Sequence, residues 1–501
     1  MKTLKINNEK IITKNFHGIS YIHQLYEYMP DKYGRNLTDE QIEFKVGIMK
    51  KMGIKYIRSF YGSSLAYDGE TGTYDFENEY MQAFYKACKK MEEAGITVGI
   101  TPQWSMSGLI SRSDKSQNGW KININYNGCY VEGDENATAE NFANFVRDSV
   151  LAFKRHGINN IKHLFCFTEC NNSFIRWGID DGKTARQKRE YDKVCRYFDL
   201  FVSAVDKGLK DAGLREEYKI VGPCDNWRAD DGSEPYSILV KYCVEHLADK
   251  IDIIGSHNGY DRSHKWTDPD FYDLPQWKLQ DPRDKAKSAG KEYFVDEFNV
   301  TLHTLNNALQ SMGALDEPMK GVALGALTNK VMNMGGINTF YLWALFDILW
   351  PDHIHHDDPS KGEFYLGVQY GGYLRNVRES RVPYKSWYSA AMLTKHLGEG
   401  NVFECEVAKN TFVSAMERYD GETVIVLTNY ENEKTDVEIN LAKSLGGKTL
   451  YKYVYNPETV VADERAEQIS CSETKENVTD KITDKLPGYC VVVYTTAKPK
   501  Q

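Results

Sequence analysis

The sequence has none of the segments that would direct a chain into or across a membrane. Its first ten residues, Met1 to Lys10, contain no apolar run of the kind found in a signal peptide. No stretch among the 501 residues stays apolar for the length that a transmembrane helix requires. We therefore expect a soluble, cytoplasmic protein with no membrane partner.

An excess of positive charge and paired cysteine motifs are also missing. Lysine and arginine number 62 against 71 aspartates and glutamates, and the net charge is −9. This balance argues against a nucleic acid or an anionic membrane as partner. The ten cysteines are scattered without any CxxC pair. Such a distribution predicts buried free thiols rather than disulfides or a metal site.

A glycine-rich phosphate-binding turn is absent after the first strand-like run, where the sequence is His17-Gly18-Ile19-Ser20. What is present is a regular alternation of strand-like and helix-like segments. Most helical patterns end at a glycine that the next strand follows closely, as at Gly53, Gly95 and Gly157. The predicted strands are Phe16–Tyr21, Lys55–Phe60, Thr97–Gln103, Ile161–Phe167, Tyr218–Val221, Ile251–Ser256, Glu292–Phe298 and Ile337–Leu345.

Eight strands that alternate with eight helices predict parallel βα units closed into a (β/α)8 TIM barrel. A doubly wound open sheet is the alternative, but it usually carries the missing glycine-rich turn. After about Gly400 the pattern changes to short alternating strands separated by turn residues, which predicts a β-sandwich. The expected domains are an N-terminal β-hairpin over 1–14, the barrel over 15–399 and the β-sandwich over 400–501. Whether the hairpin joins the sandwich is left open.

Catalytic groups of such barrels come from the carboxyl ends of the strands and the loops that follow. Two glutamates stand at these positions: Glu169 after the fourth strand and Glu297 after the seventh. Both would face one cavity. A pair of carboxylates around a sugar bond performs glycoside hydrolysis, one as the proton donor and one as the nucleophile. Arg58 on the second strand would keep the nucleophile ionised. For each glutamate alone, a structural salt bridge is the alternative.

The segments just described resemble the clan A retaining glycoside hydrolases, and family 39, the β-xylosidase and α-L-iduronidase family, most of all. The similar segments are Val295-Asp296-Glu297-Phe298-Asn299, Ile251 to His257 and Tyr341 to Ile348. The run Asp296 to Asn299 is also similar to family 51 arabinofuranosidases. The resemblance implies Glu169 as acid/base and Glu297 as nucleophile. It leaves Asp296 as a neighbour that faces away, held by backbone or by a cation.

The chain departs from this pattern where the family has Asn-Glu-Pro-Asn, because it carries Thr168-Glu169-Cys170-Asn171. His257 and Tyr260 are also spaced one residue wider than the family's histidine and tyrosine. Trp343 is the expected floor of the sugar subsite, because apolar sugar faces stack on aromatic rings. The residues expected to bind substrate are His17, Arg58, Trp104, Thr168, Asn171, His257, Tyr260, Trp343 and Asp347.

The stretch Pro351 to Asp358 contains three histidines and three aspartates, yet its spacing matches no standard metal site. We expect it to form a polar rim of the sugar pocket, with neither metal nor cofactor. The sequence thus predicts a retaining glycosidase that cleaves a terminal bond of oligosaccharides or small glycosides, with a β-xylosidase-like specificity. The alternatives are an α-L-arabinofuranosidase-type specificity and a non-catalytic carbohydrate-binding relative. A homo-oligomer is left open.

Overall fold

Eight parallel strands close into a barrel, which confirms the predicted TIM barrel. The computed structural model describes residues 1–30, 36–68, 71–102, 129, 131, 133–168, 191–225, 237–257, 277–298, 318–349, 368–369, 372–377 and 380–499. In chain order the barrel strands are β2 (Ile19–Ile22), β3 (Tyr56–Tyr61), β6 (Thr97–Pro102), β7 (Ile161–Phe165), β8 (Lys219–Asp225), β9 (Ile253–His257), β10 (Glu292–Phe298) and β11 (Thr339–Leu342). Strand β11 pairs with β2 and closes the ring.

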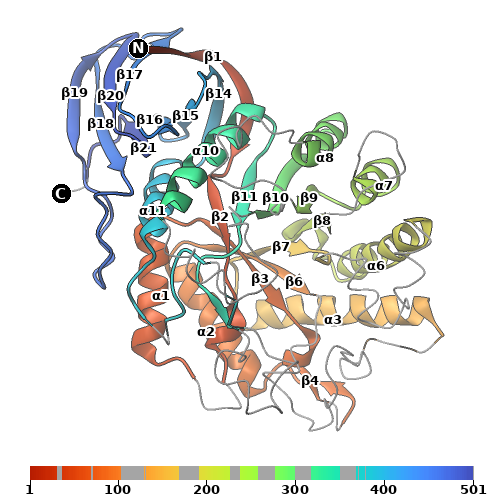
Figure 1. Ribbon diagram of the computed structural model, residues 1–501. Helices are drawn as coiled ribbons and strands as arrows, with labels where there is room; N and C mark the ends of the chain where they lie inside the picture. Colours follow the sequence, from red (N-terminus) through yellow and green to blue (C-terminus); the bar gives the residue numbers. More distant parts are fainter. Residues whose placement is uncertain are drawn as a thin grey trace, which may run out of the picture.

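Helices surround the barrel (Figure 1). They are α1 (Asp39–Met52), α2 (Glu79–Glu93), α3 (Glu135–Arg155), α6 (Tyr191–Asp211), α7 (Ile238–His246), α8 (Trp277–Ser288), α10 (Met319–Met334) and α11 (Lys385–His396). Helix α1 shows how the sequence sets their ends. Thr38 and Gln41 form a reciprocal capping box at its start, and Gly53 ends it in the left-handed conformation, with φ of +74°.

The C-terminal strands form one nine-stranded sheet in the order β19-β18-β21-β16-β15-β14-β1-β17-β20, which fits the predicted β-sandwich. Its members are β14 (Gly400–Glu406), β15 (Thr411–Arg418), β16 (Thr423–Asn429), β17 (Thr435–Leu441), β18 (Lys448–Tyr455), β19 (Glu473–Val478), β20 (Lys481–Leu486), β21 (Cys490–Thr495) and β1. Strand β1 spans Lys2–Phe16 as a single strand where a hairpin was expected. It lies between β14 and β17, so the first residues of the chain are part of this sheet.

The two edge strands of this sheet, β19 and β20, were missed in the sequence. Their sequences, ETKENV and KITDKL, carry charged residues at most exposed positions and bury few side chains. Edge strands commonly carry charge, which discourages pairing with another chain. Such strands lack the apolar alternation from which strands are recognised.

Helix α10 packs against its neighbour α11 and against the nine-stranded sheet, which lies above it in Figure 1. The contact depends on two glycines of the helix. A Cβ atom on Gly321 would lie 2.6 Å from the ring of Tyr455, and one on Gly325 would lie 2.4 Å from Val491. Asn329 adds a hydrogen bond of 2.8 Å to the Thr428 hydroxyl. Side chains of the sheet therefore pack directly against the backbone of α10 at these two glycines.

Among the described residues, no helix combines the length and the apolar character that crossing a membrane requires. The nine cysteines in this part of the chain are all free thiols, as predicted, and seven of them are buried.

Candidate active site

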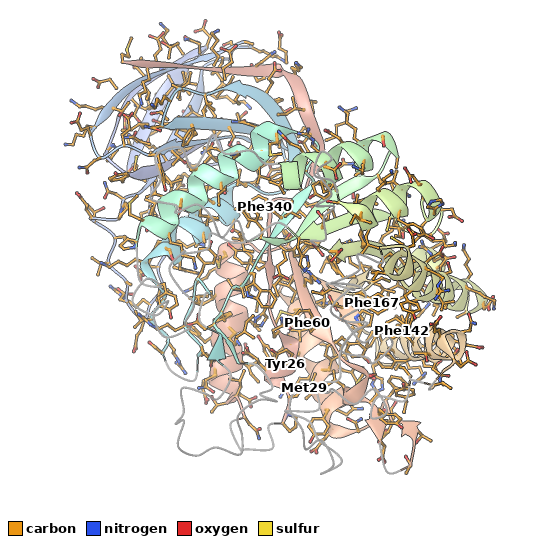
Figure 2. All side chains as sticks on the ribbon, turned by 45° about the vertical axis from the view of Figure 1, so that its right-hand side comes forward. Tyr26, Met29, Phe60, Phe142, Phe167 and Phe340 are labelled. Atoms are coloured by element: carbon orange, nitrogen blue, oxygen red, sulfur yellow. The ribbon has the colours of Figure 1, made fainter. Side chains whose placement is uncertain are left out.

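The carboxyl ends of the barrel strands lie on the side away from the nine-stranded sheet. Figure 2 labels Tyr26, Met29 and Phe60, which follow β2 or lie near the end of β3, and all three lie on this side. Phe340, on β11, lies nearer the sheet. The site is therefore built at the end of the barrel where catalytic groups of this fold are found.

Strand β10 carries the two acidic residues of the site, Asp296 and Glu297. Its pairing with β9 is regular up to Val295 and then shifts, so that Glu297 is opposite His257. Its pairing with β11 shifts at the same place. In a regular strand, consecutive side chains point to opposite faces. An irregularity re-aims a side chain, and here both carboxylates reach one imidazole ring.

His257 lies between these two carboxylates. Its Nδ1 is 2.8 Å from Oδ1 of Asp296, and its Nε2 is 3.2 Å from Oε2 of Glu297. The second contact is at ion-pair distance without the alignment of a hydrogen bond. Burial alone would lower the pKa of His257, but Asp296 and Glu297 outweigh it and raise the pKa to about 9. The ring is therefore an imidazolium at neutral pH.

Arg58 on β3 connects four strand ends across the barrel. Its side chain is 1% exposed. Its Nη1 donates to the carbonyl oxygen of Asp296 over 2.7 Å and lies 3.3 Å from Oδ2 of the same residue. Its Nε donates to the Thr101 hydroxyl over 3.0 Å, and its Nη2 donates to the Thr168 hydroxyl. The arginine therefore binds Asp296 and Thr168, where the sequence analysis expected it beside Glu297.

Asp296 is completely buried but remains ionised. Burial raises the pKa of its carboxyl group. The positive charges of His257 and Arg58 and a hydrogen bond from the Cys224 thiol lower the same pKa by more. The balance leaves the pKa of Asp296 below its ordinary value. The expectation that a cation holds Asp296 is confirmed. The expectation that Asp296 faces away was wrong, because a period-2 pattern does not contain the irregularity of β10.

The structure brings four predicted site residues together: Arg58, Thr168, His257 and Glu297. Glu297 is 7% exposed and Thr168 is 5% exposed, so little of either residue is accessible to solvent. Trp343 is close to them, since its backbone nitrogen donates over 2.8 Å to the Phe298 oxygen. Four further predictions, Trp104, Glu169, Asn171 and Tyr260, lie outside the described residues.

Two predicted substrate-binding residues lie elsewhere. His17 precedes β2 and contacts Glu292, the first residue of β10, and Tyr56, the first residue of β3. It therefore lies at the amino ends of the strands, opposite Glu297. Asp347 is completely buried, where it accepts hydrogen bonds from the Gly372 nitrogen over 2.9 Å and the Tyr384 hydroxyl over 2.8 Å. These bonds give Asp347 a structural role.

Sequence reasoning missed two contributors to the site, Thr101 and Cys224. Thr101 lies near the end of β6, where only Gln103 and Trp104 were considered. The sequence did contain a signal for Thr101, because it is a polar residue near a strand end and directly precedes a proline. Cys224 lowers the pKa of Asp296, and it has φ of +55°, a conformation that no sequence pattern predicts.

Among the described residues, no group of three or more His, Cys, Asp or Glu side chains is placed to hold a metal ion. The stretch 351–358, with its histidines and aspartates, lies outside the part of the chain that the structure describes.

The sequence matches no protein-family model and no curated protein sequence. The structure is similar to several solved structures over nearly the whole chain. A GH30 endoxylanase from Clostridium papyrosolvens C71 is 12% identical, with 99% of each chain covered and a TM-score of 0.60. A GH39 β-xylosidase from Caulobacter crescentus is 12% identical, with 100% of each chain covered and a TM-score of 0.55.

A GH51 arabinofuranosidase from Xanthomonas axonopodis pv. citri is 10% identical, with 98% of this chain and 99% of that chain covered and a TM-score of 0.60. At these identities the likeness concerns the fold. The chain shares with these proteins an eight-stranded parallel barrel joined to a β-sheet domain.

Proposed function

We propose that the protein is a retaining glycoside hydrolase that cleaves a terminal glycosidic bond of oligosaccharides or small glycosides. The observation that carries the proposal is the environment of Glu297. This carboxylate lies at the carboxyl end of the seventh barrel strand, nearly buried, with a charged imidazole 3.2 Å away. A cation beside a buried carboxylate favours its ionised form, which is the form that attacks an anomeric carbon.

Glu169 is proposed as the general acid and base. It directly follows Thr168, whose hydroxyl binds Arg58, and the same guanidinium binds Asp296, the residue before Glu297. This shared partner supports a common site for the two glutamates. In the first step Glu297 attacks the anomeric carbon while Glu169 protonates the departing oxygen. In the second step water attacks the anomeric carbon and gives a proton to Glu169, the bond to Glu297 breaks, and the sugar leaves with its original configuration.

A β-xylosidase-like specificity is proposed first. The β-xylosidase with the same fold supports it, and the arabinofuranosidase with the same fold supports the alternative. Trp343 is proposed as the floor of the sugar subsite, because its backbone is tied to Phe298, next to Glu297. Thr168 replaces an asparagine expected from the resemblance. Its hydroxyl accepts a hydrogen bond from Nη2 of Arg58.

A panel of nitrophenyl glycosides, with NMR detection of the first-formed anomer, tests the proposal. We expect hydrolysis of at least one β-glycoside or α-L-arabinofuranoside with retention of configuration. Glu297→Ala should abolish turnover and keep sugar binding. Glu169→Ala should lose most turnover on poor leaving groups and less on dinitrophenyl glycosides, which need little protonation.

Glu292→Gln is the matched control, because Glu292 lies at the other end of the same strand. It should leave turnover almost unchanged. An inverted product would contradict the double displacement. A wild type that binds sugars and hydrolyses no glycoside would favour the non-catalytic carbohydrate-binding alternative.

A further inference from the structure

We propose that Asp296 is a positioning residue, which holds His257 as an imidazolium against Glu297 throughout the reaction. Its catalytic consequence rests on the proposed function, whereas the charge on His257 does not. The four side chains Arg58, Asp296, His257 and Glu297 form a row in which positive and negative groups alternate. Asp296 is paired with both cations of the row.

The geometry shows that Asp296 acts through the ring. Its two oxygens have different partners, Oδ1 on Nδ1 of His257 and Oδ2 on Nη1 of Arg58. The bond to Nδ1 fixes the orientation of the ring and leaves Nε2 directed at Glu297. If Asp296 only neutralised the charge of Arg58, it would not require a hydrogen bond to the imidazole of His257. A completely buried carboxylate is costly unless charged partners compensate, and these two partners supply that compensation.

Asp296 also determines what happens when Glu297 loses its charge. The glycosyl-enzyme forms as a bond between a Glu297 oxygen and the anomeric carbon, and the carboxylate becomes a neutral ester. His257 would then lose one of its two anionic partners. Burial and the nearby Arg58 both favour a neutral ring, and Asp296 opposes them. The ring therefore keeps its proton in both halves of the reaction.

The groups that act on His257 within the described residues come from two strands. Asp296 and Glu297 of β10 raise its pKa, and Arg58 of β3 lowers it. Cys224 of β8 touches Asp296 and lowers the pKa of that carboxyl. Removing the charge of Asp296 should therefore lower the pKa of His257. A carboxylate at this distance typically shifts a neighbouring pKa by about 1–3 units.

The test is an NMR titration of the protein labelled with 13C at histidine Cε1, with the His257 signal assigned through His257→Gln. We expect the wild-type ring to stay protonated to about pH 9. In Asp296→Asn, which keeps the shape and removes the charge, the midpoint should fall by about 1–3 units. Asp206→Asn is the matched control, because Asp206 is also buried and paired with an arginine, on the outer helix α6. It should leave the His257 titration unchanged.

A wild-type midpoint at or below 6.5, the ordinary value for histidine, would overturn the proposal without any variant. If Asp296→Asn folds, an unchanged His257 midpoint would also overturn it. The second readout is the pH profile of kcat on an active glycoside. We expect its alkaline limb to move to lower pH in Asp296→Asn, whereas a merely structural role would lower kcat equally at every pH. The NMR result stands even if no glycoside is hydrolysed, so failure of the proposed function is recognised separately.

Discussion

Thr168 and Asp296 bind the same guanidinium group, that of Arg58. Each is the residue immediately before one of the two glutamates proposed to act on the sugar. The arginine thereby joins the end of β7 to the end of β10 through one rigid, planar group. Arginine suits this role because its donors point in fixed directions, whereas lysine offers a single charged atom.

We predict that Arg58→Lys keeps the positive charge but loses the geometry. Lysine cannot reach Thr101, Thr168 and Asp296 together, so the two strand ends lose their common partner. We expect kcat to fall by about 10²-fold, the cost of a small misplacement of reacting groups. Steady-state kinetics on an active glycoside measures this effect.

Arg58→Met removes the charge as well and leaves Asp296 with His257 as its cationic partner among the described residues. Breaking a buried pair in this way should reduce the free energy of unfolding by about 3–5 kcal/mol.

Arg215→Lys, at an ion pair outside the barrel, is the control for Arg58→Lys and should affect stability without changing kcat. Equal losses of kcat in Arg58→Lys and Arg215→Lys would contradict a role for Arg58 in the site.

We predict that His257 makes stability depend on pH in the alkaline range. Its pKa is raised in the folded protein, from an ordinary value of about 6.5 to about 9. The stabilisation is therefore fully present below pH 6.5 and is lost as the pH rises through 9. Its size is on the order of 3 kcal/mol. Asp296 has the opposite sign, because its lowered pKa gives stability that is lost as the pH falls.

Urea unfolding of the wild type and of His257→Gln between pH 6 and 10 measures this contribution as the difference between the two proteins. Lys320 would otherwise interfere, since burial lowers its pKa to about 8. It is present in both proteins and cancels in the difference. A difference that stays constant across this range would mean that His257 does not change its charge.

We predict that Gly325→Ala separates the nine-stranded sheet from α10. The new methyl group would lie 2.4 Å from Val491 and 2.8 Å from the Thr428 hydroxyl, so the sheet must shift. Overpacking of this kind costs about 1–3 kcal/mol. Thermal unfolding should show the loss. Gly47→Ala in α1 is the matched control, because no atom lies within 4 Å of the added methyl group. It should raise stability by about 1 kcal/mol, and a similar loss in both variants would refute the interface argument.

We predict that Trp343→Ala weakens substrate binding more than it slows the chemical step. The ring is 7% exposed and packs 6.0 Å from Phe60, between centroids, so a small part of it is available to a sugar. KM should rise by about tenfold or more, the loss of one stacking contact. Trp387→Phe, in the fully buried core, should change stability and leave KM alone. An unchanged KM in Trp343→Ala would remove this residue from the subsite.

The barrel could be predicted from the sequence because its signals are local. Glycines that end helices and apolar strands that follow them recur along the chain, and each is contained in a few residues. The position of Glu297 at a strand end follows from the same pattern. His257 was also found, since it ends a recognisable strand.

The connections within the site could not be predicted, because they depend on backbone details that no periodicity records. The shift in pairing after Val295 brings Asp296 and Glu297 to one ring, and Cys224 adopts a left-handed conformation beside them. His17 was misplaced because the first barrel strand begins only at Ile19, after Gly18, whose φ is +80°. A residue before a strand lies at the opposite mouth from a residue after it.

The position of β1 between β14 and β17 has a consequence for the order in which the protein folds during synthesis. Strand β1 is made before the barrel and takes its partners from residues 400–441, which are made after the barrel. Until then its backbone groups have no sheet to join. Six of the nine residues from Lys2 to Lys10 are lysine, glutamate or asparagine, which suits a segment that stays solvated until its partner strands are made. The pairing of β1 therefore closes a loop that contains the whole barrel, and it closes that loop only after the barrel has been made.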